Sequence, residues 1–482
     1  MIQPSHALPG KNKWAVFAVV AIGVFMGTLD TSIVNISLPS IARDFGVSLN
    51  GAIEWIVIAY LVMTAALLLS SGRLSDMVGR KPVWIAGLAI FTGSSAICGA
   101  APSLGILIAS RAAQGVGGAL LFATSPALLT TAFPPEERGR ALGMNAIIVA
   151  LGTSVGPTLG GVITASFSWR WIFYINLPVG LVGLFLTTRV LHTHTAHHSG
   201  EFDPVGALAL ALGLALVVGA LSFGSELGFT APLILSSGIV GILFLCLVPL
   251  VEKRVPHPLI ELSLLRNRVF LSANLSLILS FLALFAVGFI MPFYLEQVRG
   301  LPTETAGLLL TPLPVSIALI APISGHIADK THTTRWLAAG GLLVACIGLV
   351  LLALLRADST PLQIVVRLLV VGIGQAIFQS PNNSALIGSA PAQARGVASG
   401  FLATGRVVGQ SMSVAVSGAV FAGLGGAAAG AALQAGHGDA GAVDVFLAGF
   451  RTALLVCAGI ALIGVAASLI RGPDEHKTHV MR

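Results

Sequence analysis

Long apolar segments recur along nearly the whole chain, and they constrain its fold more than any other feature. A helix needs roughly 20 apolar residues to cross a bilayer. Only 9% of the 482 residues are charged, whereas soluble domains carry roughly 25%. The pattern predicts an all-α polytopic membrane protein with fourteen spans, at about 14–38, 52–71, 82–101, 104–131, 141–165, 172–191, 204–223, 232–251, 270–295, 305–327, 336–355, 361–389, 397–423 and 447–470.

The positively charged residues indicate how these spans are oriented. Of the 26 Lys and Arg, 18 fall in the loops and termini of one side, 4 in those of the other side and 4 within spans. Because cytoplasmic loops carry the excess of Lys and Arg, we expect both termini in the cytoplasm. The same rule accounts for the net charge of +7 without a nucleic-acid partner.

The chain repeats itself with an offset of 253 to 257 residues. The segment GRLSD at 72–76 is echoed by GHIAD at 325–329, Arg111 by Arg367, and Arg138-Gly139 by Arg395-Gly396. Parallel six-helix repeats are typical of rocker-type secondary transporters, whose site lies between the halves. We therefore expect an N-terminal bundle of spans 1–6 in residues 1–191, a cytoplasmic loop with inserted spans 7–8 and a linker in 192–269, and a C-terminal bundle of spans 9–14 with a cytoplasmic tail in 270–482.

Asp30 is the acid that lies most clearly within a span. An ionisable residue inside a membrane helix is a functional hypothesis by default, and Asp30 lies about 24 Å along span 1 at 1.5 Å per residue. A carboxylate there can load and release a proton, since burial favours the neutral acid and a nearby cation favours the anion. The structural alternative is a helix-end carboxylate satisfied by Thr31, Ser32 and Asn35.

Arg111 lies in span 4 at a depth comparable with that of Asp30. An arginine there must face the bundle interior and find a partner, and Asp30 is the obvious one. Anchoring of helix ends is the structural alternative.

Six motifs, each on its expected span or loop, resemble those of the major facilitator superfamily. Within it, the chain is similar to the fourteen-span drug:proton antiporters of the EmrB/QacA type. The resemblance covers nearly the whole length. Its motifs are LDTSIVN at 29–35 with Leu38-Pro39, GRLSDMVGRK at 72–81, Arg111 with Gln114-Gly115 and Gly117, Gly152 with Gly156-Pro157 and Gly160-Gly161, WRWIFYINLPVG at 169–180, and HPLIELSLLRNRVF at 257–270.

The resemblance implies roles for three groups of residues. Asp30 and Arg111 would carry proton coupling. A conformational latch would consist of Gly72, Asp76, Gly79, Arg80 and Lys81, with loop solubility as the alternative. An antiporter kink, which also provides close packing, would consist of Gly152, Gly156, Pro157, Gly160 and Gly161.

Several polar residues are candidates for lining a substrate cavity: Asn35, Glu54, Gln114, Asn382, Asn383 and Arg406. For Glu54, a surface acid is the favoured interpretation. The two asparagines fit cavity lining and packing equally well, and Arg406 needs an internal partner that the sequence does not name. Span 13 has no acid and span 10 has none before Asp329, which argues against divalent cations as substrates.

Three further features point to structure rather than chemistry. The four cysteines lie in apolar spans and read as small core residues. The HTHTAHH tract at 192–198 has no metal-ligand set nearby, so a solvated loop is expected. The low-complexity stretch at 423–441 is expected to be a flexible external loop.

These observations predict a proton-coupled antiporter that exports lipophilic or cationic small molecules across a bacterial plasma (inner) membrane by alternating access. We expect a monomer whose partners are a small lipophilic substrate, protons and membrane lipid, without nucleic acid. Apart from the proton as coupling ion, no cofactor and no metal are expected, and the sequence carries no set of residues typical of an enzyme. The alternatives are a dedicated exporter of a single metabolite or lipid, and a non-transporting scaffold or sensor of the same fold.

Overall fold

The computed structural model describes residues 13–47, 51–134, 137–191, 204–252, 264–331, 334–391 and 395–471. Every regular element within these ranges is helical. The histidine-rich tract at 192–198 lies outside them, so the solvated loop expected there stays a prediction.

Seven helices make up what we call the N-terminal bundle. Each helix follows one of the apolar runs of the first repeat. Residues that do not favour a helix set where the helices end. Gly79 alone separates two of the helices and has a φ of 102°, a conformation that glycine adopts without steric cost. The helices are α1 (Lys13–Phe45), α2 (Gly51–Val78), α3 (Arg80–Ala100), α4 (Leu104–Ala132), α5 (Arg138–Ser166), and the short α6 (Trp171–Tyr174) continued by α7 (Asn176–Val190).

A helical hairpin, α8 (Pro204–Leu227) and α9 (Pro232–Glu252), follows the N-terminal bundle. It matches the inserted pair expected at 204–223 and 232–251. The α8 helix packs against both α2 and α15, and Trp55 of α2 stacks on Phe223 of α8. The hairpin thus covers one side of the line where the two bundles meet.

The remaining helices make up the C-terminal bundle. Its spans are less regular than those of the N-terminal bundle. A π-turn, η3 (Tyr294–Val298), extends α10, and span 10 is split into α11 and α12. The elements are η2 (Leu264–Arg266), α10 (Arg268–Phe293), α11 (Thr303–Leu310), α12 (Pro312–Thr331), α13 (Thr334–Ala353), α14 (Pro361–Gly388), α15 (Arg395–Gly423), α16 (Gly426–Gln434) and α17 (Ala440–Leu469).

The helix α16 corrects one expectation. The stretch at 423–441 was expected to be a flexible loop, yet its centre is helical, bent by 77° from α15, and packed against α17 and η3. Five of its nine residues are alanine, the strongest helix former. An alanine-rich segment of low complexity can therefore form a helix where it has a surface to pack against.

Within the described residues, eleven helices are long and apolar enough to cross a membrane, or twelve if the bent pair of α15 and α16 is one span. In α8 and α9, the apolar stretches Leu208–Gly224 and Pro232–Val248 are shorter. The chain is therefore a multi-pass membrane protein, and the fourteen-span count goes beyond what these helices establish.

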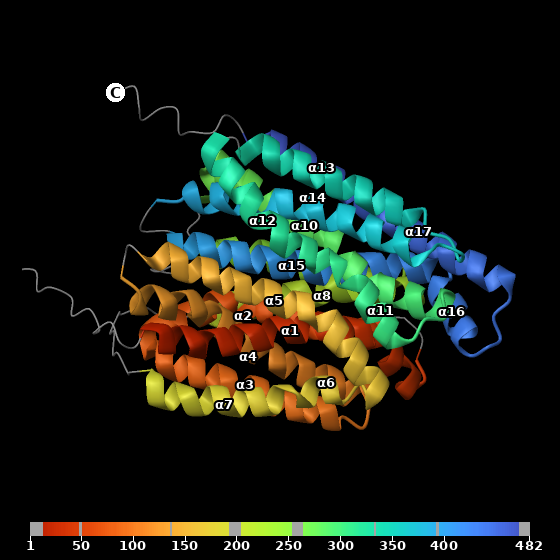
Figure 1. Ribbon diagram of the computed structural model, residues 1–482, viewed down its shortest axis with the longest axis horizontal. Helices are drawn as coiled ribbons and strands as arrows, with labels where there is room; N and C mark the ends of the chain where they lie inside the picture. The colour runs from red at the N-terminus through yellow and green to blue at the C-terminus, as the bar shows by residue number, and fades with distance from the viewer. Residues whose placement is uncertain are drawn as a thin grey trace, which may run out of the picture.

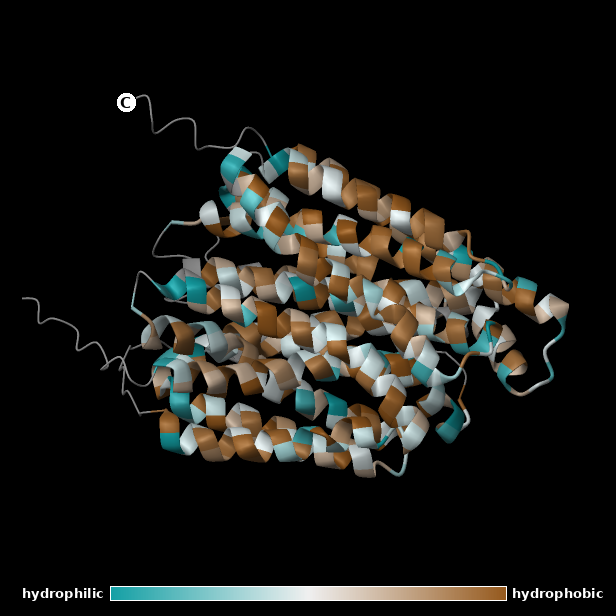
Figure 2. Ribbon diagram, viewed as in Figure 1, coloured by the Kyte–Doolittle hydropathy of each residue, from teal (hydrophilic) through white to brown (hydrophobic). Residues whose placement is uncertain are grey.

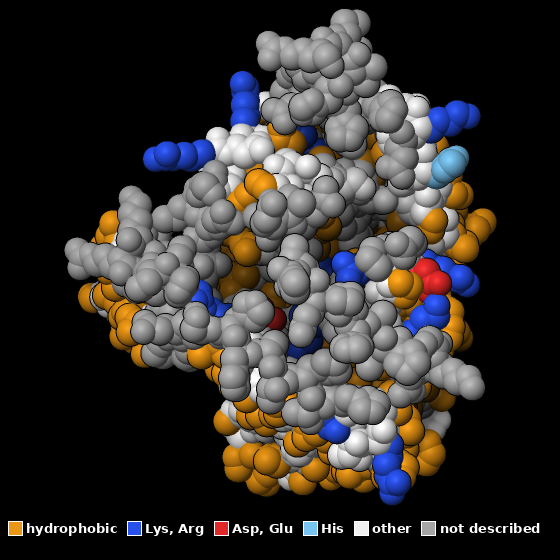
Figure 3. Space-filling model, turned by 90° about the vertical axis from the view of Figure 1, so that its left-hand side faces the viewer, with side chains coloured by type: hydrophobic (Ala, Val, Ile, Leu, Met, Phe, Trp, Pro, Cys, Tyr) orange, Lys and Arg blue, Asp and Glu red, His pale blue; other side chains and the backbone are white. Residues whose placement is uncertain are grey.

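The two bundles lie side by side with their helices running in one general direction (Figure 1). The α1 helix begins and α17 ends at the same, left-hand end of this view. We call this the Lys13 end and the opposite one the Phe45 end. Hydrophobic residues run along the helices, and hydrophilic ones gather mainly near both ends (Figure 2). Seen from the Lys13 end, basic side chains are spread over the described surface and acidic ones are few (Figure 3).

Candidate coupling site and the seam between the bundles

Asp30 lies near the middle of α1 and is fully buried, with 0% of its surface exposed. Arg111 of α4 is also buried, and its Nη1 donates to Asp30 Oδ2 at 2.5 Å. The structure therefore brings together the two residues that sequence reasoning singled out for coupling. An ion pair this deep persists only where additional hydrogen bonds satisfy both groups.

Polar side chains from three helices complete the surroundings of Asp30. Gln114 Nε2 donates to Asp30 Oδ1 at 2.8 Å, and Asn176 Nδ2 donates to the same oxygen at 3.1 Å. Ser95 Oγ accepts from both amides, at 2.8 Å from Gln114 and 3.3 Å from Asn176. The carboxylate is thus held directly by α4 and α7, and α3 holds the two amides in place through Ser95; we call these residues with Arg111 the Asp30 cluster.

The Arg111 guanidinium has contacts besides Asp30. Its Nε donates to the carbonyl of Ile56 at 2.9 Å and its Nη1 to Gln114 Oε1 at 2.5 Å. Its central carbon lies 4.4 Å from the centroid of the Tyr60 ring, a distance at which a cation is attracted to an aromatic face. These contacts would hold Arg111 in place even if Asp30 lost its charge.

Sequence reasoning missed Asn176 as a partner of Asp30 and Ser95 as the acceptor that holds the two amides, and it placed Gln114 among cavity candidates rather than beside the acid. Asn176 lies within the segment at 169–180 that resembles a family motif, and this was the available signal. Ser95 has no signal in the sequence, because serines at helical spacing are common in membrane spans.

The glycines of the expected kink in α5 face two different helices. Toward α1, an added Cβ at Gly160 would lie 2.6 Å from Ile36, and Gly152 accepts a hydrogen bond from Ser32 at 3.2 Å. Toward α11, an added Cβ at Gly161 would lie 2.6 Å from the carbonyl oxygen of Thr303. The motif therefore lets α5 pack closely against its own bundle and against the other one at the same time.

Two polar contacts reinforce this meeting of the bundles toward the Phe45 end. Thr158 of α5 and Thr311, just after α11, share a hydrogen bond. Arg43 at the end of α1 forms an ion pair with Glu296 of η3 at 3.6 Å. We call this region, with the α5–α11 contact, the Phe45 seam.

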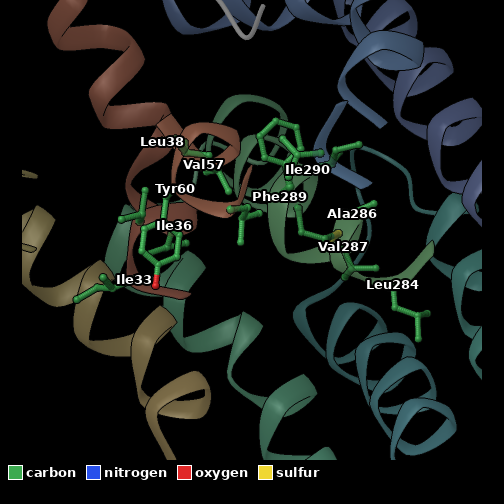
Figure 4. Close-up of a cluster of buried hydrophobic side chains, with 14 of the residues drawn as sticks. Ile33, Ile36, Leu38, Val57, Tyr60, Leu284, Ala286, Val287, Phe289 and Ile290 are labelled. Carbon is green, nitrogen blue, oxygen red and sulfur yellow. The ribbon is translucent and has the colours of Figure 1, made fainter. Parts of the chain in front are cut away.

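An apolar cluster lies behind the Phe45 seam. Side chains of α1 and α2 face those of α10 across the line between the bundles (Figure 4). The labelled members are buried at 4% exposure or less, so the two bundles meet here in a closely packed apolar contact. The labelled residues are Ile33, Ile36, Leu38, Val57, Tyr60, Leu284, Ala286, Val287, Phe289 and Ile290.

For the transporter that the sequence predicts, linking the two threonines of the Phe45 seam should stop transport. In a background with the four native cysteines replaced by serine, Thr158→Cys with Thr311→Cys should form a disulfide under mild oxidant, because the parent hydroxyls are already in contact. Uptake into vesicles should fall to background when the link forms and return when a reductant breaks it. Each single cysteine is the control, and unchanged uptake in the linked protein would show that this seam does not need to open.

The cavity candidates of the N-terminal bundle lie near the C-terminal one. Asn35 is buried and its amide lies near Gly288 of α10. Glu54 was expected at the surface, which is wrong: it is 0% exposed, and its carboxylate lies against Gly418 of α15. The glycine leaves room for a carboxylate that the local sequence gives no reason to bury.

The candidates of the C-terminal bundle have different environments. Asn382 is buried and donates to the carbonyl of Ala273 at 3.0 Å, while its Oδ1 accepts from the buried Arg471. These contacts are those of a packing residue. Asn383 and Arg406 are both half-buried.

The expected latch residues contact only their own bundle in this arrangement. Arg80 pairs with Asp76 at 4.0 Å and donates to the carbonyl of Ala127 in α4 at 2.7 Å. Lys81 donates to the carbonyl of Thr188 in α7 at 3.3 Å. Gly79 forms the turn between α2 and α3, whereas Gly72 lies within α2 and faces open space. Among the described residues, Asp76, Arg80 and Lys81 therefore join helices of one bundle.

Comparisons with known proteins agree with this architecture. The family model described as Major Facilitator Superfamily matches residues 20–414, which is most of the chain. The chain belongs to the major facilitator superfamily. It is therefore a membrane transporter with the all-helical fold of that family, and not an enzyme.

Relatives and a solved structure add detail. The chain is 37% identical over 413 residues to the riboflavin transporter RibZ of Clostridioides difficile, covering 86% of this chain and 89% of the relative. It is 33% identical to the multidrug resistance protein Stp of Mycobacterium tuberculosis, and the match covers 85% of this chain and 76% of that relative. A bacterial homologue of the human lysosomal transporter Spinster, in an inward-facing and unoccupied conformation, shares the fold with a TM-score of 0.69, at 16% identity and over 97% of this chain and 98% of that chain.

Proposed function

We propose that this chain is a proton-coupled antiporter that exports lipophilic small molecules across the plasma membrane of a bacterium by alternating access. The observation that carries the proposal is the buried ion pair between Asp30 and Arg111. Buried ion pairs add little to stability compared with apolar packing, so a membrane transporter that keeps one at mid-span has a functional reason to do so.

In this proposal Asp30 exchanges its proton with the two sides of the membrane in turn. As a carboxylate it holds Arg111 by an ion pair. When it takes up a proton, the charge attraction is lost, and Arg111 keeps the Ile56 carbonyl, Gln114 and the Tyr60 ring as partners. The two protonation states therefore differ in how firmly α1 is tied to α4, and that difference can bias the movement of one bundle against the other.

The closed Phe45 seam fits one of the two states that alternating access requires. Basic residues gather at the Lys13 end, which supports a cytoplasmic location for it. The Phe45 end would then face outward, and the seam would be the outer closure. The latch residues Asp76, Arg80 and Lys81 would contact the C-terminal bundle only in the opposite state.

We further propose that the chain has fourteen spans, as in the EmrB/QacA type of antiporter. The hairpin of α8 and α9 would supply spans 7 and 8 between six-helix bundles in residues 1–191 and 270–482. Its position against α2 and α15 supports this, because a hairpin on that line can follow both bundles as they move. We propose a monomer that needs no cofactor beyond the proton.

A dedicated exporter of one metabolite is the second candidate function. The observation in its favour is the 37% identity with a protein named as a riboflavin transporter. The 33% identity with a multidrug resistance protein supports the broader substrate range.

Transport by the purified protein in liposomes tests the proposal. With an acidic lumen, outflow of protons should drive uptake of at least one of ethidium, pyrenebutyrate and riboflavin, and a protonophore should abolish it. Uptake of several unrelated probes would support an exporter with a broad substrate range. Uptake of riboflavin alone would support a dedicated exporter of one metabolite. If folded protein moves its probe equally well with and without the gradient, the antiporter proposal is wrong.

A further inference from the structure

Arg406 is a cation in the membrane interior whose partner the proposed function does not supply. It lies about 16 Å along α15 from the first residue of that helix at 1.5 Å per residue. Its side chain is half-buried. Among the described residues it has no hydrogen bond and no ion pair, although an arginine at this depth is expected to be paired.

The packing of α15 shows which way Arg406 points. Gly400 and Gly418, about five turns apart, both face α2, and Gly405 and Gly409 face α10. Residues advance about 100° per position around a helix, so Arg406 lies on a third face, with Gln410 and Ser413.

The position of Tyr60 shows which region this third face of α15 lies against. Arg406 lies within electrostatic range of Tyr60, and the neutral Tyr60 side chain points into the N-terminal bundle, where its ring covers Arg111 and its hydroxyl lies near Gly118 of α4. The α8 hairpin lies on the other side of α2, against Trp55. Arg406 therefore faces the interior between the bundles and not the hairpin.

No acid of the described interior neutralises Arg406. Asp30 is taken by Arg111, and Glu296 pairs with Arg43. Glu54 lies opposite Gly418, about 18 Å along α15 from Arg406. The sequences of α10, α14 and α15 contain no acidic residue at all. The region around Arg406 is therefore positively charged.

We propose that Arg406 binds an anionic group of the substrate, so that the transported molecules are lipophilic organic anions. The inference rests on the proposed function, and it narrows the lipophilic or cationic class expected from the sequence. Arginine suits this role because its planar guanidinium matches a carboxylate or phosphate with two parallel hydrogen bonds. A lipophilic cation would meet an uncompensated positive charge at the same place.

Binding of three matched probes to the full chain in nanodiscs tests the inference. Pyrenebutyrate, pyrenebutanol and pyrenebutylamine share one apolar body and differ in charge. With empty nanodiscs subtracted, the acid should bind at least about tenfold more tightly than the alcohol, the order that a hydrogen bond to a charged group contributes. The amine should bind more weakly than the alcohol.

Variants then assign the preference to one side chain. Arg406→Gln should reduce binding of the acid about tenfold and leave the alcohol unchanged, whereas Arg406→Lys should keep a preference for the acid. Arg451→Gln, at an exposed arginine of α17, is the control and should behave as wild type. Equal binding of acid and alcohol to wild type, or a preference for the acid that survives Arg406→Gln, would overturn the inference.

This binding assay does not depend on transport. A chain that prefers the acid but shows no gradient-driven uptake would leave the anion site standing and remove the antiporter proposal. A chain that shows proton-coupled transport but binds the amine best would support the antiporter proposal and remove the anion site.

Discussion

Replacing Asp30 by asparagine is expected to abolish proton-driven uptake while the protein still binds its substrate. The asparagine can keep the hydrogen bonds from Gln114 and Asn176, but it cannot gain or lose a proton. Uptake into liposomes with an acidic lumen should fall to the level of protein-free liposomes. Exchange of labelled substrate without a gradient should persist, because that step does not require the proton.

The same substitution should lower the stability of the protein. It leaves the charge of Arg111 buried without its ion-pair partner, and breaking a buried pair in this way typically costs about 3–5 kcal/mol. The double variant Asp30→Asn with Arg111→Gln removes both charges, so it should regain much of the thermal stability but none of the coupling. Ser95→Ala is the matched control, since it removes a hydroxyl of the same cluster and no charge. Full gradient-driven uptake by folded Asp30→Asn protein would remove Asp30 from the coupling step.

Adding one methyl group at Gly161 is expected to prevent the Phe45 seam from closing. The new Cβ would lie 2.6 Å from a backbone oxygen of α11, and a backbone atom cannot move aside without moving the helix. Gly143→Ala in the same helix is the control, because an added Cβ there has no atom within 4 Å. Alanine favours a helix over glycine by about 1 kcal/mol, so both variants share that gain and only Gly161→Ala carries the clash.

A cysteine at Thr158, in the background without native cysteines, reports the state of the seam. Its reaction with a membrane-impermeant maleimide should be faster in Gly161→Ala than in Gly143→Ala, and uptake should be slower by about tenfold or more if the clash costs over ~1.4 kcal/mol in the closed state. Equal labelling and equal uptake in the two variants would show that close packing of α5 on α11 is not needed for the cycle.

Much of the fold and the centre of the site could be predicted from the sequence. Apolar runs of sufficient length give the spans, because a bilayer leaves a buried segment almost no alternative to a helix. The pairing of Asp30 with Arg111 followed from their similar depth, since each is costly alone in the membrane. The motif of α5 indicated close packing. Its four glycines and one proline recur about one helical turn apart, so they leave one side of the helix without bulky side chains.

What could not be predicted depends on contacts between distant helices. The burial of Glu54 is set by the absence of a side chain at Gly418, on another bundle and more than 350 positions later in the sequence. Asn176 reaches Asp30 from α7, and Ser95 of α3 holds the amides of Asn176 and Gln114; no local pattern marks Ser95, and the motif that contains Asn176 does not say which residue it contacts. The helix α16 forms where composition suggested a loop, because α17 and η3 give its alanines a surface to pack on.

In the proposed cycle, substrate crosses the membrane in exchange for protons at Asp30. The most direct measurement is the reciprocal one, in liposomes that contain a trapped pH-sensitive dye and start without a pH gradient. Inward movement of the probe with the highest gradient-driven uptake should make the lumen alkaline with wild-type protein, and should leave the pH unchanged with Asp30→Asn and in protein-free liposomes. Entry of the probe through wild-type protein without any change of lumenal pH would rule out exchange of substrate for protons.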